Sequence, residues 1–222
     1  MASIVSEAAR VHGGARRRLP EAVPRWVRHR AWRAVDFVAL DVQATEADPR
    51  GDAVVSFAAV PVRAGRVDLR EARCGKVTPD RPSSQGSVGI APGLKERVDD
   101  LDQTLEPLRV ALDRRYLITW SAEVEAPFLD QMFGGGRIRW LRRTIDVHRL
   151  VSIADRLQGR GPRPEDYGLD ALAGEFRLPV PQPCDPMDAA LTTAQLFLIL
   201  ATKLAGLGHR DVGSLLWRPR AR

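Results

Sequence analysis

Three acidic side chains that lie far apart in the sequence could act together. Asp41 closes an apolar segment that is predicted to be a strand, Glu125 opens a predicted helix just after an apolar segment, and Asp188 begins the longest predicted helix. Carboxylates that meet where strands end and helices begin can bind hard divalent cations. Two such cations, about 3.5–4 Å apart, can stabilise the attacking and leaving oxygens of a phosphodiester during hydrolysis. Taken singly, each acid is also typical of a turn or of the first turn of a helix.

The elements that must position these acids change in type along the chain. Residues rich in Val, Ala and Leu predict strands at 36–41, at 53–62 and from 67 to 70, and the short turns between them predict an antiparallel meander. Further strands are predicted at 116–120 and 142–146, and helices alternate with them. Predicted helices include the apolar residues between 101 and 112 and the segments 125–133, 147–157, 170–176 and 188–204. This order predicts an α/β fold with a mixed sheet flanked by helices.

The spacing of the acids is more specific than any one of them. Asp41 follows Phe37-Val-Ala-Leu, Glu125 is followed by Phe128-Leu129, and Asp188 is followed by Ala-Ala-Leu-Thr-Thr-Ala. Together with Gly168-Leu-Asp-Ala-Leu172, these segments resemble the DnaQ-like (DEDD) 3′→5′ exonucleases, the group that includes the proofreading epsilon subunit of bacterial DNA polymerase III. The resemblance runs from about residue 36 to residue 204. It implies a ribonuclease H-like mixed sheet, in which the antiparallel meander continues into parallel strands.

The resemblance also implies a site in which four carboxylates bind two Mg²⁺ or Mn²⁺ ions. The catalytic positions fall on Asp41, Gln43, Glu125 and Asp188, of which all but Gln43 could still ligate a metal through a carboxylate. The histidine that orients the attacking water in the family corresponds to Pro183. Loss of a general base typically slows a reaction about 10²- to 10⁴-fold. The longer side chain of Glu125 and the neutral amide of Gln43 further predict weak or single-site metal binding and impaired hydrolysis.

Other side chains near these motifs are interpreted as structural or as neighbours of the site. The tyrosine used by a sister group of the family corresponds to Cys184, which we interpret as an inert thiol rather than a base. Asp146 and His148 follow the predicted strand at 142–146, and we expect Asp146 to be a structural acid near the site and His148 a neighbour rather than a substitute base.

Charge divides the chain into three predicted parts. Residues 1–34 carry eight arginines against two acids, and the last residues from 210 onward are also basic, although the whole chain has a net charge of only +6. We therefore expect a basic N-terminal arm at 1–34, an exonuclease-like domain at 35–207 and a basic tail at 208–222. The cluster Arg16, Arg17 and Arg18 predicts contact with nucleic acid, although arginine bias can also reflect coding composition.

Composition excludes some classes of protein. Two cysteines, Cys74 and Cys184, are too few for a disulfide scaffold or a four-cysteine zinc site, and a reducing, cytoplasmic setting is the expectation. The most apolar segment, 189–207, is interrupted by polar residues, among them Gln195 and Lys203, so no membrane span is predicted.

Three functions stay open from the sequence. The first is a degenerate member of the exonuclease family that binds nucleic acid 3′ ends or a nucleotide and hydrolyses slowly or not at all. The second is an active Mg²⁺- or Mn²⁺-dependent exonuclease of DNA or RNA. The third is a protein-interaction module in which the N-terminal arm and the tryptophans Trp26, Trp32, Trp120 and Trp217 contact a partner protein.

Overall fold

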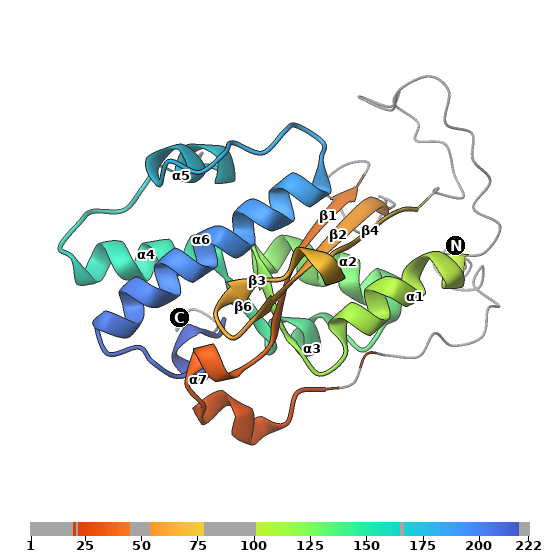
Figure 1. Ribbon diagram of the computed structural model, residues 1–222, viewed down its shortest axis with the longest axis horizontal. Coiled ribbons are helices and arrows are strands. Elements are labelled where there is room, and N and C mark those ends of the chain that lie inside the picture. The colour runs from red at the N-terminus through yellow and green to blue at the C-terminus, as the bar shows by residue number, and fades with distance from the viewer. Residues whose placement is uncertain (1–19, 21, 45–53, 78–100, 165–166, 218–222) are drawn as a thin grey trace, which may run out of the picture.

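The computed structural model describes residues 20, 22–44, 54–77, 101–164 and 167–217, with the backbone alone for 101–104. Within these residues a six-stranded mixed sheet lies between two layers of helices (Figure 1). β1 pairs antiparallel with β2 and parallel with β5, which pairs parallel with β6. The expected ribonuclease H-like arrangement, a meander that continues into parallel strands, is therefore confirmed.

The strand order is β3-β2-β1-β5-β6, and β4 pairs with β2 next to β3. β1 is central, and four consecutive residues from Phe37 to Leu40 are fully buried because helices cover both faces of the sheet. The strands are β1 (Phe37–Ala44), β2 (Val54–Arg63), β3 (Arg66–Val67), β4 (Arg73–Lys76), β5 (Tyr116–Thr119) and β6 (Thr144–Asp146).

Each face of the sheet has its own core. One contains Phe37, Ala39 and Ile118 from the sheet and packs against α4 to α7; the other contains Val38, Leu40 and Leu117 and packs against α1 to α3. The α-helices are α1 (Leu101–Leu112), α2 (Ala122–Phe133), α3 (Arg137–Leu141), α4 (Val147–Leu157), α5 (Leu169–Glu175), α6 (Pro186–Gly206) and α7 (Val212–Leu215). Short 3₁₀ helices are η1 (Arg25–His29), η2 (Trp32–Ala34) and η3 (Leu69–Glu71).

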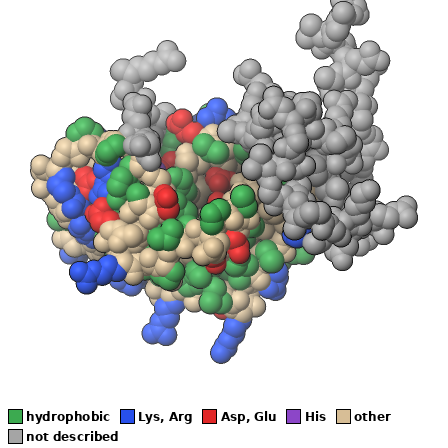
Figure 2. Space-filling view, turned by 90° about the horizontal axis from the view of Figure 1, so that it is seen from above, with side chains coloured by type: hydrophobic (Ala, Val, Ile, Leu, Met, Phe, Trp, Pro, Cys, Tyr) green, Lys and Arg blue, Asp and Glu red, His purple; other side chains and the backbone are tan. Residues whose placement is uncertain are grey.

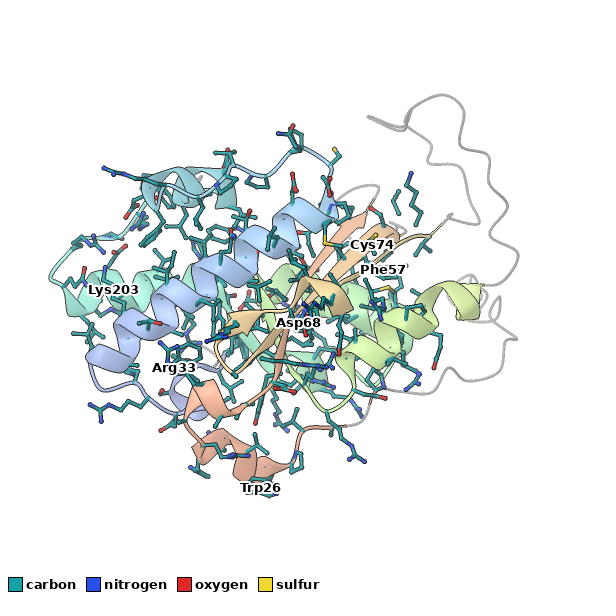
Figure 3. All side chains as sticks on the ribbon, in the orientation of Figure 1. Trp26, Arg33, Phe57, Asp68, Cys74 and Lys203 are labelled. Atoms are coloured by element: carbon teal, nitrogen blue, oxygen red, sulfur yellow. The ribbon has the colours of Figure 1, made fainter. Side chains whose placement is uncertain are left out.

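The third strand of the meander differs from the sequence prediction. The segment from 67 to 70 was expected to be one strand, but β3 ends at Val67, and η3 follows at once. The Asp68 side chain accepts a hydrogen bond from the backbone N–H of Arg70, which favours a turn there. The chain then returns as β4, and Cys74 pairs with Ala58 of β2 (Figure 3). The outer edge of the meander therefore consists of two short strands, β3 and β4, that both pair with β2.

The functional elements also begin or end at other residues than expected. β1 continues to Ala44, so Asp41 lies within the strand and not at its end. α2 begins three residues before Glu125, and α6 begins at Pro186, with Asp185 as its N-cap. Proline is favoured in the first turn of a helix because its missing N–H needs no partner there. The acids thus lie at the predicted edge of the sheet, Asp41 within its strand and Glu125 and Asp188 within the first turns of their helices.

The described residues of the N-terminal arm and the C-terminal tail pack together on the domain. The backbone N–H of Trp32 donates to Arg210, and that of Val212 donates to Arg30. Trp32 is buried against Phe197 of α6, with ring centroids 5.6 Å apart, so it is not available to a partner protein. Trp26 is 63% exposed and lies at the lower end of the molecule in Figure 3. The arm and tail boundaries stay predictions, and Arg16, Arg17 and Arg18 lie outside the described residues.

Helix α6 is long and apolar enough to cross a membrane by length and composition alone. It instead packs against β1 and β2 on one side and α4 and α5 on another, and ten of its residues are buried inside the domain. Its hydropathy is accounted for by this core position.

Candidate functional site

The candidate site lies at the edge of the sheet toward which β1, β5 and β6 run. α2 and α4 begin directly after β5 and β6, and α6 begins beside β1, so three helix N-termini gather near this edge (Figure 1). Ligands of open sheets with parallel strands commonly bind at this edge. Figure 2 looks onto this end of the molecule and shows acidic side chains near the middle of the face, with Lys and Arg toward its margins.

Asp41 projects from β1 on the α6 side of the sheet, because Ala39, two residues earlier, belongs to the core beneath α6. Its Oδ2 accepts a hydrogen bond of 2.6 Å from Nε2 of Gln43, the next residue on the same face. Burial raises the pKa of Asp41 to about 6; the Gln43 hydrogen bond lowers it, and the charge of Asp185 raises it. Gln43 therefore stabilises the Asp41 carboxylate, whereas a second carboxylate at 43 would repel it.

Glu125 lies in the first turn of α2 and is buried. Burial raises its pKa well above the usual value, the Asp41 charge raises it further, and a hydrogen bond from the backbone N–H of Val42 lowers it. The contact with Val42 brings Glu125 against β1 beside Asp41. Its Oε2 atom is buried and has no hydrogen-bond partner among the described residues. A buried carboxylate oxygen without a partner is costly, so this pair of acids favours a proton or a cation.

The acids at the start of α6 have structural bonds of their own. Asp185 caps the helix by accepting from the backbone N–H groups of Met187, at 2.8 Å, and Asp188, at 3.2 Å. The Asp188 Oδ2 atom accepts a longer bond of 3.3 Å from the backbone N–H of Gln182, which fixes the preceding loop. Among these two acids, it is Asp185 whose charge acts on Asp41. Sequence reasoning missed Asp185; the signal that could have found it is the Asp185-Pro186 pair before an apolar helix, which is typical of an N-cap.

Asp146 positions the beginnings of two helices. It caps α4 by accepting from the backbone N–H of Arg149 at 2.8 Å, and its other oxygen accepts from the backbone N–H of Ala122, the first residue of α2, at 2.9 Å. Burial raises the pKa of Asp146, and these two hydrogen bonds lower it. The expected structural role of Asp146 is confirmed, and through α2 it also fixes the position of Glu125.

The described residues contain no group of three or more His, Cys, Asp or Glu side chains placed to hold a metal ion. Asp41 and Glu125 lie together, while Asp188 lies at the same end of the sheet without completing a cluster with them. Two carboxylates, one with an unpartnered oxygen, form a donor set suited to one hard cation. The residues present fit such an ion in part, and the metal role of Asp41, Glu125 and Asp188 stays a prediction.

The position expected for a general base is occupied by the loop before α6. Pro183 and Cys184 are both exposed there, and Cys184 has a left-handed backbone with φ of 60°. His148 lies elsewhere, at the start of α4, in an edge-to-face contact with Trp120. The sequence analysis named Trp120 and His148 but did not predict that their rings are in contact.

Comparisons with known proteins give a likeness of fold alone. The sequence matches no family model and no curated protein. A crystal structure of E. coli exonuclease I in complex with a dA16 oligonucleotide matches with a TM-score of 0.60 at 16% identity, covering 78% of this chain and 42% of that one. The zinc-bound form of the exonuclease I–ssDNA complex matches with a TM-score of 0.56 at 14% identity, over 78% of this chain and 42% of that one.

A second protein gives the same result. Cell-death related nuclease 4 matches with a TM-score of 0.52 at 12% identity, over 75% of this chain and 64% of the nuclease. This chain therefore spans less than two thirds of the length of each of these structures. Its described core has the ribonuclease H-like fold that is seen in these exonucleases and nucleases.

Proposed function

We propose that this chain binds the 3′ end of single-stranded nucleic acid at the carboxyl edge of β1 and β5, as a degenerate relative of the DnaQ-like exonucleases with some kinship to the epsilon subunit. The observation that carries the proposal is the pair formed by the half-buried Asp41 and the buried Glu125, which has no basic side chain bonded to it among the described residues. The fold likeness to exonuclease I bound to oligonucleotide supports the choice of ligand.

Hydrolysis is expected to be slow. A divalent cation at Asp41 and Glu125 would neutralise the phosphate and polarise its oxygen when bound. Gln43 holds one Asp41 oxygen through its amide N–H, so one oxygen fewer is free for such an ion. In the exposed loop before α6, Pro183 and Cys184 occupy the positions of the family's His and Tyr, and neither supplies the imidazole or phenol used there. The residues present can therefore bind and orient a 3′ end, but they lack a complete set for cleavage.

The test is release of mononucleotides from a labelled single-stranded DNA in Mn²⁺, together with measured binding of the same DNA. We expect binding with little release. Installing Gln43→Glu, Glu125→Asp and Pro183→His together should raise the rate about 10²-fold or more, since a restored base alone typically contributes this much. Rapid release by the unaltered protein, abolished by Asp41→Ala, would instead identify an active Mn²⁺-dependent exonuclease. Absence of binding would overturn the proposal.

A further inference from the structure

An aromatic pair lies at the same carboxyl edge of the sheet as the acids. The Trp120 and His148 rings meet edge to face, with centroids 5.5 Å apart and planes at 71°. Both side chains are half-buried, unlike Trp32 and Trp140, which are enclosed in the two cores. In an edge-to-face pair, one ring offers only its edge, so its faces stay free of that partner. Such a half-exposed pair can receive a further flat ring.

The position of Trp120 follows from the register of the parallel strands. The parallel pairing of β1 with β5 runs as far as Ala39 and Ile118, and Trp120 follows β5 directly, at the end of the sheet where Asp41 lies. Trp120 packs against the same core layer as Ala39, and adjacent strands lie about 4.8 Å apart. Trp120 therefore lies on the α6 side of the sheet, at the same end as Asp41.

The pair is held by a backbone hydrogen bond and by the buried side chain of Asp146. The backbone N–H of His148 donates to the carbonyl of Trp120 at 3.1 Å. Asp146 joins the start of α4 to the start of α2 through its two oxygens, which fixes both segments that carry the rings. Glu125, whose buried Oε2 has no hydrogen-bond partner among the described residues, lies in the first turn of α2, the helix that begins two residues after Trp120. A rigid ring at the same edge of the sheet as such a group is suited to one end of a nucleotide.

We infer that Trp120, supported by His148, is a stacking platform for the terminal nucleobase of a single-stranded 3′ end. The inference rests on the proposed function and assigns each part of the ligand to residues of the site. The Trp120 ring would stack on the base, and Asp41 and Glu125 would bind the sugar–phosphate through a cation. Stacking on an aromatic side chain accepts any base, because every base has a π-face. The platform therefore confers affinity for a terminal base without sequence preference.

The test compares two 5′-fluorescein dT12 oligonucleotides that differ only at the 3′ end, one with thymidine and one with an abasic residue. Fluorescence anisotropy in Ca²⁺, with the oligonucleotides checked for integrity, gives both dissociation constants. We expect the unaltered protein to bind the thymidine end about tenfold more tightly, a typical effect of one base–aromatic stack. Trp120→Ala should abolish this preference and leave affinity for the abasic end unchanged, while Trp120→Phe should keep most of it.

His148→Ala should lose part of the preference, since the indole would lose its lateral support. Trp26→Ala is the matched control, because Trp26 is exposed at the opposite end of the molecule and should change nothing (Figure 3). If Trp120→Ala does not fold by circular dichroism, Trp120→Leu keeps the apolar volume and takes its place. Equal affinity for both ends, or a preference that survives Trp120→Ala or Trp120→Leu, would overturn the platform. Failure to bind either oligonucleotide would overturn the proposed function itself.

Discussion

Acidic side chains are buried in two regions of the molecule, and the two regions differ in whether arginines accompany them. Between α4 and α5, Asp155 is 4% exposed and pairs with Arg160 and Arg163, each at 2.5 Å. Arg163 also reaches Glu175 at 2.5 Å, and Tyr167 donates to the same carboxylate. The Arg163 hydrogen bond lowers the pKa of Glu175 to about 2, against a smaller raising effect of burial.

At the carboxyl edge of the sheet, the pKa values of the acids are raised instead of lowered. No ion pair that the described residues form includes Asp41 or Glu125, and burial raises the pKa of both. Acids that stabilise a fold are paired, whereas acids kept buried without a cation reduce stability and are typical of sites that act on a ligand. The difference indicates that Asp155 and Glu175 hold α4 and α5 together, and it is the difference that the proposed binding role of Asp41 and Glu125 requires.

The largest expected effect comes from removing the cation of the paired region. Arg163→Ala leaves Asp155 buried with only the half-exposed Arg160, so we expect the free energy of unfolding in urea to fall by about 3 kcal/mol. Arg160→Ala is the matched control and should lower it by about 1 kcal/mol, because that side chain is 45% exposed. Equal losses for the two variants would show that Arg163 does not organise the region.

A neutral substitution should act in opposite directions in the two regions. Glu125→Gln keeps an acceptor for the Val42 N–H, places a donor toward Asp41 and removes a buried charge, so we expect the free energy of unfolding at pH 8 in EDTA to rise by about 2 kcal/mol. Asp155→Asn removes the carboxylate that pairs with both Arg160 and Arg163, so it should lower the free energy of unfolding. Destabilisation by both variants would contradict the assignment of Glu125 as an uncompensated acid.

The smallest effect is the pH dependence that Asp41 confers. Its pKa is raised from 3.8 to about 6 on folding, so the folded protein binds more protons than the unfolded chain between these values. The stability that this proton contributes is therefore lost as the pH rises through 6, by about 1.4 kcal/mol from pH 5 to pH 8. Urea unfolding of Asp41→Asn in EDTA should lack this part of the slope. If the free energy of unfolding of Asp41→Asn depended on pH as in the unaltered protein, a group other than Asp41 would be responsible.

Much of the fold was predictable because its elements have clear local patterns. The buried strands at β1 and β5 are runs of apolar residues, and α6 combines an acidic start with a long apolar face. The division of the third strand was not predictable from hydrophobicity, since it depends on the turn that the Asp68 side chain stabilises.

The site could be predicted only in part. The pattern of the sequence indicated Asp41, Gln43, Glu125 and Asp188, and the structure brings the first three together. It did not indicate that Asp185 acts on Asp41, since that depends on where the N-cap of α6 meets the sheet. The contact of Trp120 with His148 joins two segments that are adjacent only through the parallel pairing of β5 and β6.

The most direct measurement is photocrosslinking of a single-stranded DNA that carries 4-thiothymidine at its 3′ terminus, followed by tryptic mapping. We expect the crosslink in the tryptic peptide 116–137, which contains both Trp120 and Glu125. The same label at the 5′ terminus should not modify this peptide. A 3′ crosslink that maps instead to the paired region between Asp155 and Glu175, with none in 116–137, would contradict a binding site at the unpaired acids.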